Sequence, residues 1–276
     1  MKTFDTLVVG AGLFGQVIAK ALAKQGRSVV VMDDSRPMNG TAPSGMLMKP
    51  SWFAGLGSKI YDPALEVMNN LYDIQELKFK VGPKTTSALY VPHDQVMSMD
   101  VTPYKVLKVE DNGHVLVEQG DNKAWLQFKL VVIAAGIWSN ELTEVPKLEG
   151  KQGVSFIWNV PVSENWRDNF IMPWAPYKQV VGFRRSEKEI WAGDGTAIKP
   201  ENWKESRVDE CLKRCRKHVK LERPPKAIMG IRPYVKGAKP AYVRQQSDHV
   251  WVATGGAKNG TIAAGWAAHV IVNGTS

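Results

Sequence analysis

Three stretches of the sequence predict an α/β fold, α+β overall, in which a mainly antiparallel region interrupts a parallel one. Residues 6–9 form an apolar run that is followed by a glycine-rich turn and a helical pattern. Residues 129–136 form a second apolar run, which ends in small residues, and residues 153–196 contain short strand-like runs separated by turn residues. Fully apolar runs indicate buried parallel strands, whereas short runs between turns are typical of antiparallel sheets.

The N-terminal segment has the order strand, turn, helix, strand, acid. Its turn is Gly10-Ala11-Gly12-Leu13-Phe14-Gly15, its second strand covers residues 28–32, and Asp33 lies 33 − 10 = 23 residues after Gly10. Glycines allow the backbone to approach a pyrophosphate closely, and the helix N-terminus attracts the phosphates. An acid about 20 residues further on accepts the ribose hydroxyls. The segment therefore predicts a Rossmann-like unit that binds FAD or NAD.

The rest of the chain predicts further elements by periodicity and turn chemistry. We expect a hairpin around Asp111-Asn112-Gly113 and a helix over 205–219 with one apolar stripe. The other expected elements are strands at 154–160, 169–172, 179–183, 189–192 and 250–253, and a helix from Thr261.

Composition narrows the class of protein. The chain has 276 residues and no apolar run of the about 20 residues that a membrane span needs, so we expect a cytoplasmic protein, in a host cell if a phage encodes it. Its two cysteines, Cys211 and Cys215, and its scattered histidines predict neither a disulfide nor a metal site. The net charge is 36 − 27 = +9, which favours nucleic acid or anionic surfaces as partners, or serves solubility alone.

Four separated motifs occur in a fixed order along the chain. They are the Gly10–Gly15 unit with Asp33, the segment Ala42-Pro43-Ser44-Gly45-Met46-Leu47, the segment Ala134-Ala135-Gly136-Ile137-Trp138-Ser139, and Gly230-Ile231-Arg232-Pro233 followed by residues 253–260. In this order the set resembles the D-amino-acid oxidase family of flavoproteins, most closely its glycine oxidase branch.

The resemblance implies noncovalently bound FAD rather than NAD, and an amine as substrate. The residues implied in cofactor binding are Gly10, Ala11, Gly12, Phe14, Gly15, Asp33, Asp34, Ser44, Gly45, Met46, Ala135, Gly136, Trp138, Gly256, Lys258, Asn259, Gly260 and Thr261. It also implies that Arg232 clamps a substrate carboxylate, for which the planar guanidinium is suited, and that Lys258 tunes the flavin. From the residues alone, Arg232 could instead pair at the surface and Lys258 could be a solvated lysine.

The resemblance further implies a discontinuous domain layout. We expect an FAD-binding domain from residues 1–48, 95–150 and 229–276, and an inserted substrate domain from residues 49–94 and 151–228. The chain is short for the family, mainly in the substrate domain, and it has Gly256-Ala257 where bulkier residues are common in glycine oxidases. A smaller substrate domain should leave the reactive face of the flavin more open.

Three functions stay open at this point. The first is oxidation of an N-substituted glycine carried on a base of DNA or RNA, as in the oxidase domain of the bifunctional tRNA wobble-uridine enzyme and in phage FAD enzymes of thymidine hypermodification, which the chain resembles. The second is oxidation of a free small amino acid such as glycine or sarcosine, and the third is a reductase or a non-catalytic FAD-binding module. The charge favours the first function, with candidate nucleic-acid contacts at Arg184-Arg185, residues 213–220, Lys236, Lys239 and Arg244. The sequence identifies neither the electron acceptor nor the oligomeric state.

Overall fold

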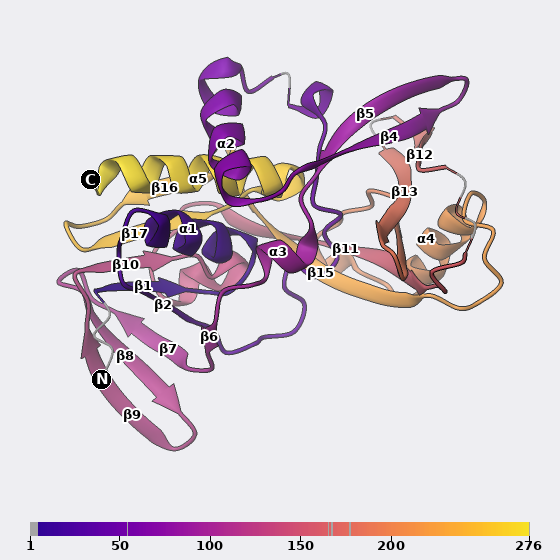
Figure 1. Ribbon diagram of the computed structural model, residues 1–276. Coiled ribbons are helices and arrows are strands. Elements are labelled where there is room, and N and C mark those ends of the chain that lie inside the picture. Colours follow the sequence, from indigo (N-terminus) through magenta and orange to yellow (C-terminus); the bar gives the residue numbers. More distant parts are fainter. Residues whose placement is uncertain (1–4, 54, 165, 167, 177, 276) are drawn as a thin grey trace.

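A six-stranded, mostly parallel sheet forms one half of the protein (Figure 1). The computed structural model describes residues 5–53, 55–164, 166, 168–176 and 178–275. The strand order is β16 (Tyr242–Gln245), β17 (Val250–Thr254), β10 (Leu130–Ile133), β1 (Thr6–Val9), β2 (Val29–Met32) and β6 (Val101–Thr102). All neighbours run parallel except β16 and β17. Both ends of the chain and its middle thus meet in one sheet, which confirms the predicted Rossmann-like architecture.

Successive residues of β1 face opposite sides of this sheet, as the two-residue period of a strand requires. Val8 belongs to a buried cluster formed with the three helices α1 (Leu13–Lys24), α2 (Ser58–Leu71) and α5 (Gly260–Gly274). These helices lie together in Figure 1. Leu7 and Val9 belong to a second cluster, formed with the three-stranded sheet β7 (Lys105–Val109), β8 (His114–Gln119) and β9 (Asn122–Gln127). β7 and β8 form the hairpin predicted around residues 111–113.

An eight-stranded sheet forms the other half. Its order is β15 (Lys226–Val235), β11 (Leu148–Asn159), β14 (Glu189–Gly193), β13 (Lys178–Ser186), β12 (Phe170–Ala175), β4 (Gln75–Val81), β5 (Lys84–Tyr90) and β3 (Leu47–Met48). Among the pairings described, only that between β4 and β12 is parallel. The helix α4 (Ser206–Arg216) covers part of this sheet with the buried side chains Cys211 and Cys215. The strands expected between 153 and 196 and the helix expected over 205–219 are therefore confirmed as β11 to β14 and α4.

The two halves share segments, which bears on the expected domain layout. Residues 49–94 contain α2, which contacts α5 of the first half, as well as β4 and β5 of the second. The division into domains remains a prediction. Short helices complete the description: α3 (His93–Val96), η1 (Pro50–Trp52), η2 (Gly136–Glu141), η3 (Pro200–Asn202) and η4 (Ala257–Asn259).

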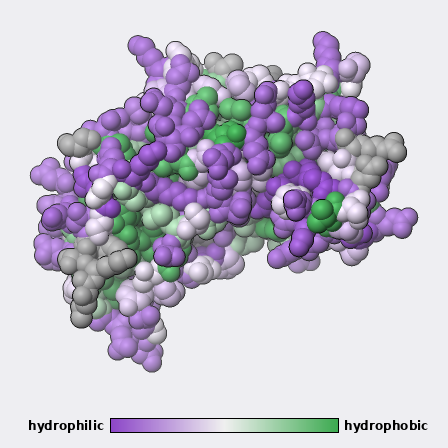
Figure 2. Space-filling model, viewed as in Figure 1, coloured by the Kyte–Doolittle hydropathy of each residue, from purple (hydrophilic) through white to green (hydrophobic). Residues whose placement is uncertain are grey.

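The surface is largely polar. Figure 2 shows hydrophilic residues over most of the visible face, with hydrophobic residues exposed between them. No helix in the described part of the chain has the length and apolar character needed to cross a membrane.

Candidate active site

One cavity of about 860 Å³ brings the four sequence motifs together. It begins at the glycine turn after β1 and reaches η4 and β15 in the other half of the chain. The residues of the predicted site that line it are Gly10, Ala11, Gly12, Phe14, Asp33, Asp34, Ser44, Gly45, Met46, Ala135, Gly136, Trp138, Arg232, Gly256, Lys258, Asn259, Gly260 and Thr261. Gly15 is the one member of the predicted set that does not line it.

The glycine turn is fixed by close backbone contacts. Gly10 has φ of +102°, and a Cβ there would lie 2.6 Å from the carbonyl oxygen of Ala134. A Cβ at Gly15 would lie 1.8 Å from the carbonyl oxygen of Gly10, closer than any real contact. Gly15 therefore serves the packing of α1 against the turn, and the other glycines shape the cavity wall.

The N-terminus of α1 faces the cavity with some of its amides already bonded. The Ala11 amide donates to Oδ2 of Asp33 at 2.6 Å, and the Leu13 amide donates to Oγ1 of Thr41 at 2.8 Å. The amides of Gly12 and Phe14 have no hydrogen-bond partner among the described residues. These two donors and the helix dipole fit an anion such as a pyrophosphate. Thr41 was missed by the sequence analysis, because its hydroxyl reaches the turn from 28 residues away.

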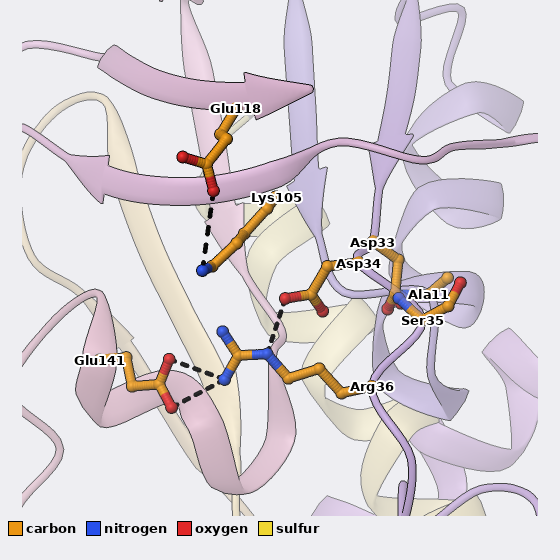
Figure 3. Close-up of polar contacts among 8 residues, drawn as sticks. All are labelled: Ala11, Asp33, Asp34, Ser35, Arg36, Lys105, Glu118 and Glu141. Carbon is orange, nitrogen blue, oxygen red and sulfur yellow. Dashed lines mark hydrogen bonds and ion pairs between the residues drawn. The ribbon is translucent and has the colours of Figure 1, made fainter. Parts of the chain in front are cut away.

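Charged residues at this end of the cavity are paired with one another (Figure 3). Arg36 donates from Nε to Asp34 and from Nη1 to both carboxylate oxygens of Glu141, each at 2.7 Å. Burial lowers the pKa of Arg36, but the hydrogen bonds and charges of Glu141 and Asp34 outweigh it and raise the pKa above the ordinary value. The guanidinium carbon lies 5.6 Å from the ring centroid of Trp138. Nothing in the sequence pattern pointed to Arg36 or Glu141.

Asp33 differs from Asp34, because its carboxylate is bonded to backbone only. Its Oδ2 accepts from Ala11 and its Oδ1 accepts from the amide of Ser35 at 2.5 Å. Each carboxylate oxygen has a second lone pair, so both can still accept from ribose hydroxyls.

The chain leading into the second motif, from Met38 to Pro43, crosses directly over the fourth motif. The Ile231 amide donates to the carbonyl of Met38 at 2.8 Å, and a Cβ at Gly230 would lie 2.3 Å from the carbonyl oxygen of Asn39. The carbonyl of Pro43 accepts from Oγ of Ser155 at 2.8 Å and from the indole of Trp191 at 3.2 Å. Glycine at 230 is therefore required by the crossing, and the crossing holds Ser44, Gly45 and Met46 at the cavity wall.

Arg232 is placed at the far end of the cavity by β15. It lies directly opposite Lys151 on β11, and its Nη2 atom would be 3.6 Å from a Cβ at Gly153. Its guanidinium has no hydrogen bond or ion pair with any residue that the structure describes. Burial lowers the pKa of Arg232 and the charge of Asp194 opposes that effect. An arginine without a partner, lining a cavity, is suited to receive a carboxylate.

Asp194 is the carboxylate whose charge acts on Arg232, and its side chain is fully buried. It accepts from Nε of Arg214 at 2.6 Å, and from the amide and hydroxyl of Thr196 at 2.9 Å each. The guanidinium of Arg214 lies 4.4 Å from the ring centroid of Trp174. Arg214 is thus part of the fold rather than of a solvated basic face.

Lys258 lies on η4 at the cavity wall, just before the N-terminus of α5. Burial lowers the pKa of its ammonium, and the positive charges of Arg232 and Lys178 lower it further. The neighbouring Gly256 has its Cα against Phe14, since a Cβ there would be 2.8 Å from that ring. The small residue at 256 therefore accommodates the phenylalanine of the glycine turn.

Two family comparisons bear on this arrangement. Residues 101–273 match the family model DAO, described as FAD dependent oxidoreductase, and residues 8–73 match a model described as NAD(P)-binding Rossmann-like domain. The chain belongs to the DAO family of FAD-dependent oxidoreductases. FAD is therefore the cofactor, as the sequence motifs predicted, and the cavity with its glycine turn and partly free helix N-terminus fits it.

Solved structures share the fold at low sequence identity. An iminodiacetate oxidase from Chelativorans sp. BNC1 is 13% identical with a TM-score of 0.67, covering 98% of this chain and 96% of that chain. A glycine oxidase from Geobacillus kaustophilus is 14% identical with a TM-score of 0.64, covering 98% and 94%. An L-amino acid deaminase from Proteus vulgaris is 12% identical with a TM-score of 0.68, covering 100% and 91%. A search of curated proteins finds no significant match to this DAO-family chain.

Proposed function

We propose that the protein oxidises the CH–NH bond of a small amine that carries a carboxylate. The observation that carries the proposal is Arg232, which lines the cofactor cavity and has no partner among the described residues. The similarity to an iminodiacetate oxidase and to glycine oxidases supports the same chemistry.

The residues around the glycine turn would hold the cofactor without a covalent bond. The free amides of Gly12 and Phe14 receive the pyrophosphate, and Asp33 receives the ribose hydroxyls. Both cysteines lie in α4, and no cysteine or histidine of the described chain lines the cavity, so the usual attachment side chains are not at hand. Bound FAD supplies the two-electron acceptor for the reaction.

At the other end, Arg232 would orient the substrate. Its two-pronged guanidinium fixes the plane of the carboxylate, which holds the adjacent carbon and its C–H bond at one place in the cavity. The substrate would lose the C–H hydrogen with two electrons, for which bound FAD is the acceptor, and a proton from nitrogen to solvent, which leaves an imine. Water would then hydrolyse the imine to a carbonyl compound and ammonia or an amine. Lys258 and the N-terminus of α5 provide positive potential that favours the negative charge of the reduced cofactor.

The test is anaerobic reduction of the purified yellow protein by glycine or sarcosine, followed as loss of flavin absorbance. We expect Arg232→Lys to lower kcat/KM roughly 100-fold, since lysine keeps the charge but loses the two-pronged contact. Arg244→Lys on the exposed part of β16 is the matched control and should leave the rate unchanged. If Arg232→Ala reduces as fast as wild type, the protein does not use this site for amine oxidation, and a reductase or a non-catalytic FAD-binding module is the better assignment.

A second candidate substrate is the same glycine-type amine carried on a base of DNA or RNA. The net charge of +9 favours it, and Lys213, Arg216, Lys217, Lys220, Lys236, Lys239 and Arg244 are exposed. The other predicted nucleic-acid contacts are already bound to groups of the protein or buried. Arg184 donates to the carbonyls of Glu164 and Glu187, the Arg185 side chain is 9% exposed beside Glu189, and Arg214 binds Asp194.

The free and the base-borne amine are distinguished by offering both to the same protein. Flavin reduction only by nucleic acid bearing a glycyl-modified pyrimidine would establish the second candidate, and binding should then weaken as salt rises. Reduction by free glycine or sarcosine, with no salt-dependent binding of DNA or RNA, would make the basic surface incidental.

A further inference from the structure

We propose that the side-chain amide of Gln179 binds the amine nitrogen of the substrate whose carboxylate Arg232 receives. This inference rests on the proposed function, because it adds a second contact to the same substrate. Its basis is the face that the eight-stranded sheet presents to the cavity between these two side chains.

Gln179 lies on the cavity face of β13. Side chains along a strand alternate between the two faces of a sheet, and Gln179 and Val181 both line the cavity. Val180, between them, belongs with Cys211 and Cys215 of α4 to a buried cluster on the other face. The side chain of Gln179 therefore points into the cavity, on a face whose next member in β13 is apolar.

The Gln179 amide is free to bind a ligand. It has no hydrogen bond to any residue that the structure describes, and the side chain is half-buried. Other polar side chains at the cavity wall are used by the fold, since Ser155 donates to the carbonyl of Pro43 at 2.8 Å and Thr254 donates to that of Gly136 at 2.9 Å. A ligand can thus supply a partner to Gln179 without breaking a contact of the protein.

Two glycines separate Gln179 from the guanidinium of Arg232. Gly195 follows β14, and a Cβ there would lie 3.5 Å from the carbonyl oxygen of Gln179. On β11, a Cβ at Gly153 would lie 3.6 Å from Nη2 of Arg232, so the guanidinium lies over this glycine. The same Cβ would lie 2.7 Å from the carbonyl oxygen of Thr196, the residue after Gly195. The floor between the two side chains is therefore bare backbone.

The width of this floor matches a glycine-type molecule. β14 lies between β13 and β11, so Gln179 and Gly153 are two strand spacings apart, about 10 Å. A hydrogen bond of about 2.9 Å at each end and an amino-acid unit of roughly 3.5 Å cover nearly this distance. One such molecule can reach both side chains, with its carboxylate on Arg232 and its nitrogen towards Gln179.

The chemistry of the two receptors fixes this direction. The guanidinium takes the anionic group, and the amide oxygen of Gln179 accepts from an N–H of the amine. With both ends held, the C–N bond that is oxidised has one orientation in the cavity. The contact favours primary and secondary amines, because a neutral tertiary amine has no N–H to donate.

Binding of sarcosine and of butyrate to the FAD-loaded protein tests this contact. Butyrate has CH2 in place of the NH of sarcosine, so it keeps the carboxylate and lacks the donor. The concentration dependence of anaerobic flavin reduction gives the Kd of sarcosine, or calorimetry does if the flavin stays oxidised, and calorimetry gives the Kd of butyrate. We expect Gln179→Met to weaken sarcosine binding about fivefold, the effect of one lost hydrogen bond, without weakening butyrate binding.

A matched control and a second variant separate the possible failures. Gln75→Met, at the exposed start of β4 in the same sheet, should bind both ligands as wild type does. If Gln179→Met binds sarcosine as tightly as wild type, weakens both ligands equally, or loses bound FAD, the amine contact is overturned. Arg232→Lys should weaken both ligands, and the carboxylate site then stands whatever the result at Gln179. If Arg232→Lys changes neither affinity, or wild type binds neither ligand, the proposed function fails and the amine contact fails with it.

Discussion

The two ends of the cavity are built in different ways. At the glycine-turn end, the chain is held by backbone contacts, and its charged side chains are matched, as in the contact of Arg36 with Asp34 and Glu141 (Figure 3). At the Arg232 end, side chains from β13, β15 and η4 converge, and the positive charges outnumber the negative ones.

This difference separates what binds the cofactor from what selects the substrate. The charges of the first end are matched within the part of the chain that the structure describes, because each acid there has a partner and the amides of Gly12 and Phe14 are free to bind the cofactor. The second end is complete only with an anionic ligand, since Arg232 has no partner among the described residues. We therefore expect changes at the first end to act on cofactor binding and folding, and changes at the second to act on substrate choice.

The largest effect is expected from a substitution at Gly15, because it would disrupt the backbone contacts that build the glycine-turn end. Gly15→Ala would place a methyl group 1.8 Å from the carbonyl oxygen of Gly10, so α1 and the turn cannot keep their positions. We expect loss of bound FAD, measured as the ratio of flavin to protein absorbance, with circular dichroism showing whether the fold survives. Gly55→Ala is the control, because a Cβ there meets nothing within 4 Å. Full flavin content in Gly15→Ala would show that the turn is less constrained than these contacts require.

A smaller effect, on the stability of the fold, is expected at Asp194, near the Arg232 end of the cavity. Asp194 is buried and its carboxylate accepts from Arg214 at 2.6 Å, so Asp194→Asn leaves the charge of Arg214 without its partner. We expect a loss of about 3 kcal/mol in the free energy of unfolding. Urea denaturation measures it, with Asp168→Asn as control, because the Asp168–Lys80 pair is exposed and should contribute less than about 1 kcal/mol. Replacing Arg214 as well, by methionine, should recover part of the loss. Equally small losses of unfolding free energy in Asp194→Asn and Asp168→Asn would show that the Asp194–Arg214 pair is not a stabilising buried ion pair.

The same division explains how much the sequence could predict. The βαβ unit, the buried strand β10 and the glycine at 230 are local in sequence or fixed by backbone geometry, so periodicity and motif order identify them. All but one of the predicted site residues line one cavity, and the exception, Gly15, keeps a structural reason for being glycine.

The remaining site residues could not be predicted, because each depends on a contact between distant segments. Thr41 meets the amide of Leu13, Arg36 meets Glu141 across 105 residues, and Arg214 meets Asp194 across 20. Arg184, Arg185 and Arg214 were predicted to be surface cations, because arginine side chains are usually solvated. In the structure, Arg184 donates to backbone carbonyls and Arg214 donates to the carboxylate of Asp194. The side chain of Arg185 is almost fully buried.

The smallest predicted effect lies at the junction of the two halves, on α3. Burial and the positive charge of Arg185 lower the pKa of His93 to about 4, although the negative charge of Asp94 partly opposes them. The Nε2 atom of His93 has no hydrogen-bond partner among the described residues. The folded protein therefore keeps His93 neutral down to about pH 4, whereas the unfolded chain takes up a proton below its ordinary pKa of 6.5. Because the unfolded state binds more protons in this window, stability falls as the pH drops from 6.5 towards 4.

We expect His93 to contribute about 1–2 kcal/mol to the difference in unfolding free energy between pH 7 and pH 5, after allowance for its partial exposure. Urea denaturation at the two pH values measures that difference for wild type and for His93→Gln, in which it should shrink by this amount. His114→Gln on β8 is the matched control and should keep the wild-type pH dependence. An unchanged pH dependence in His93→Gln would mean that His93 takes up its proton in the folded state, so that Arg185 and the buried surroundings do not hold it neutral. The junction would then tolerate a second positive charge beside Arg185, and the contrast between matched and unmatched charge would be confined to the cavity.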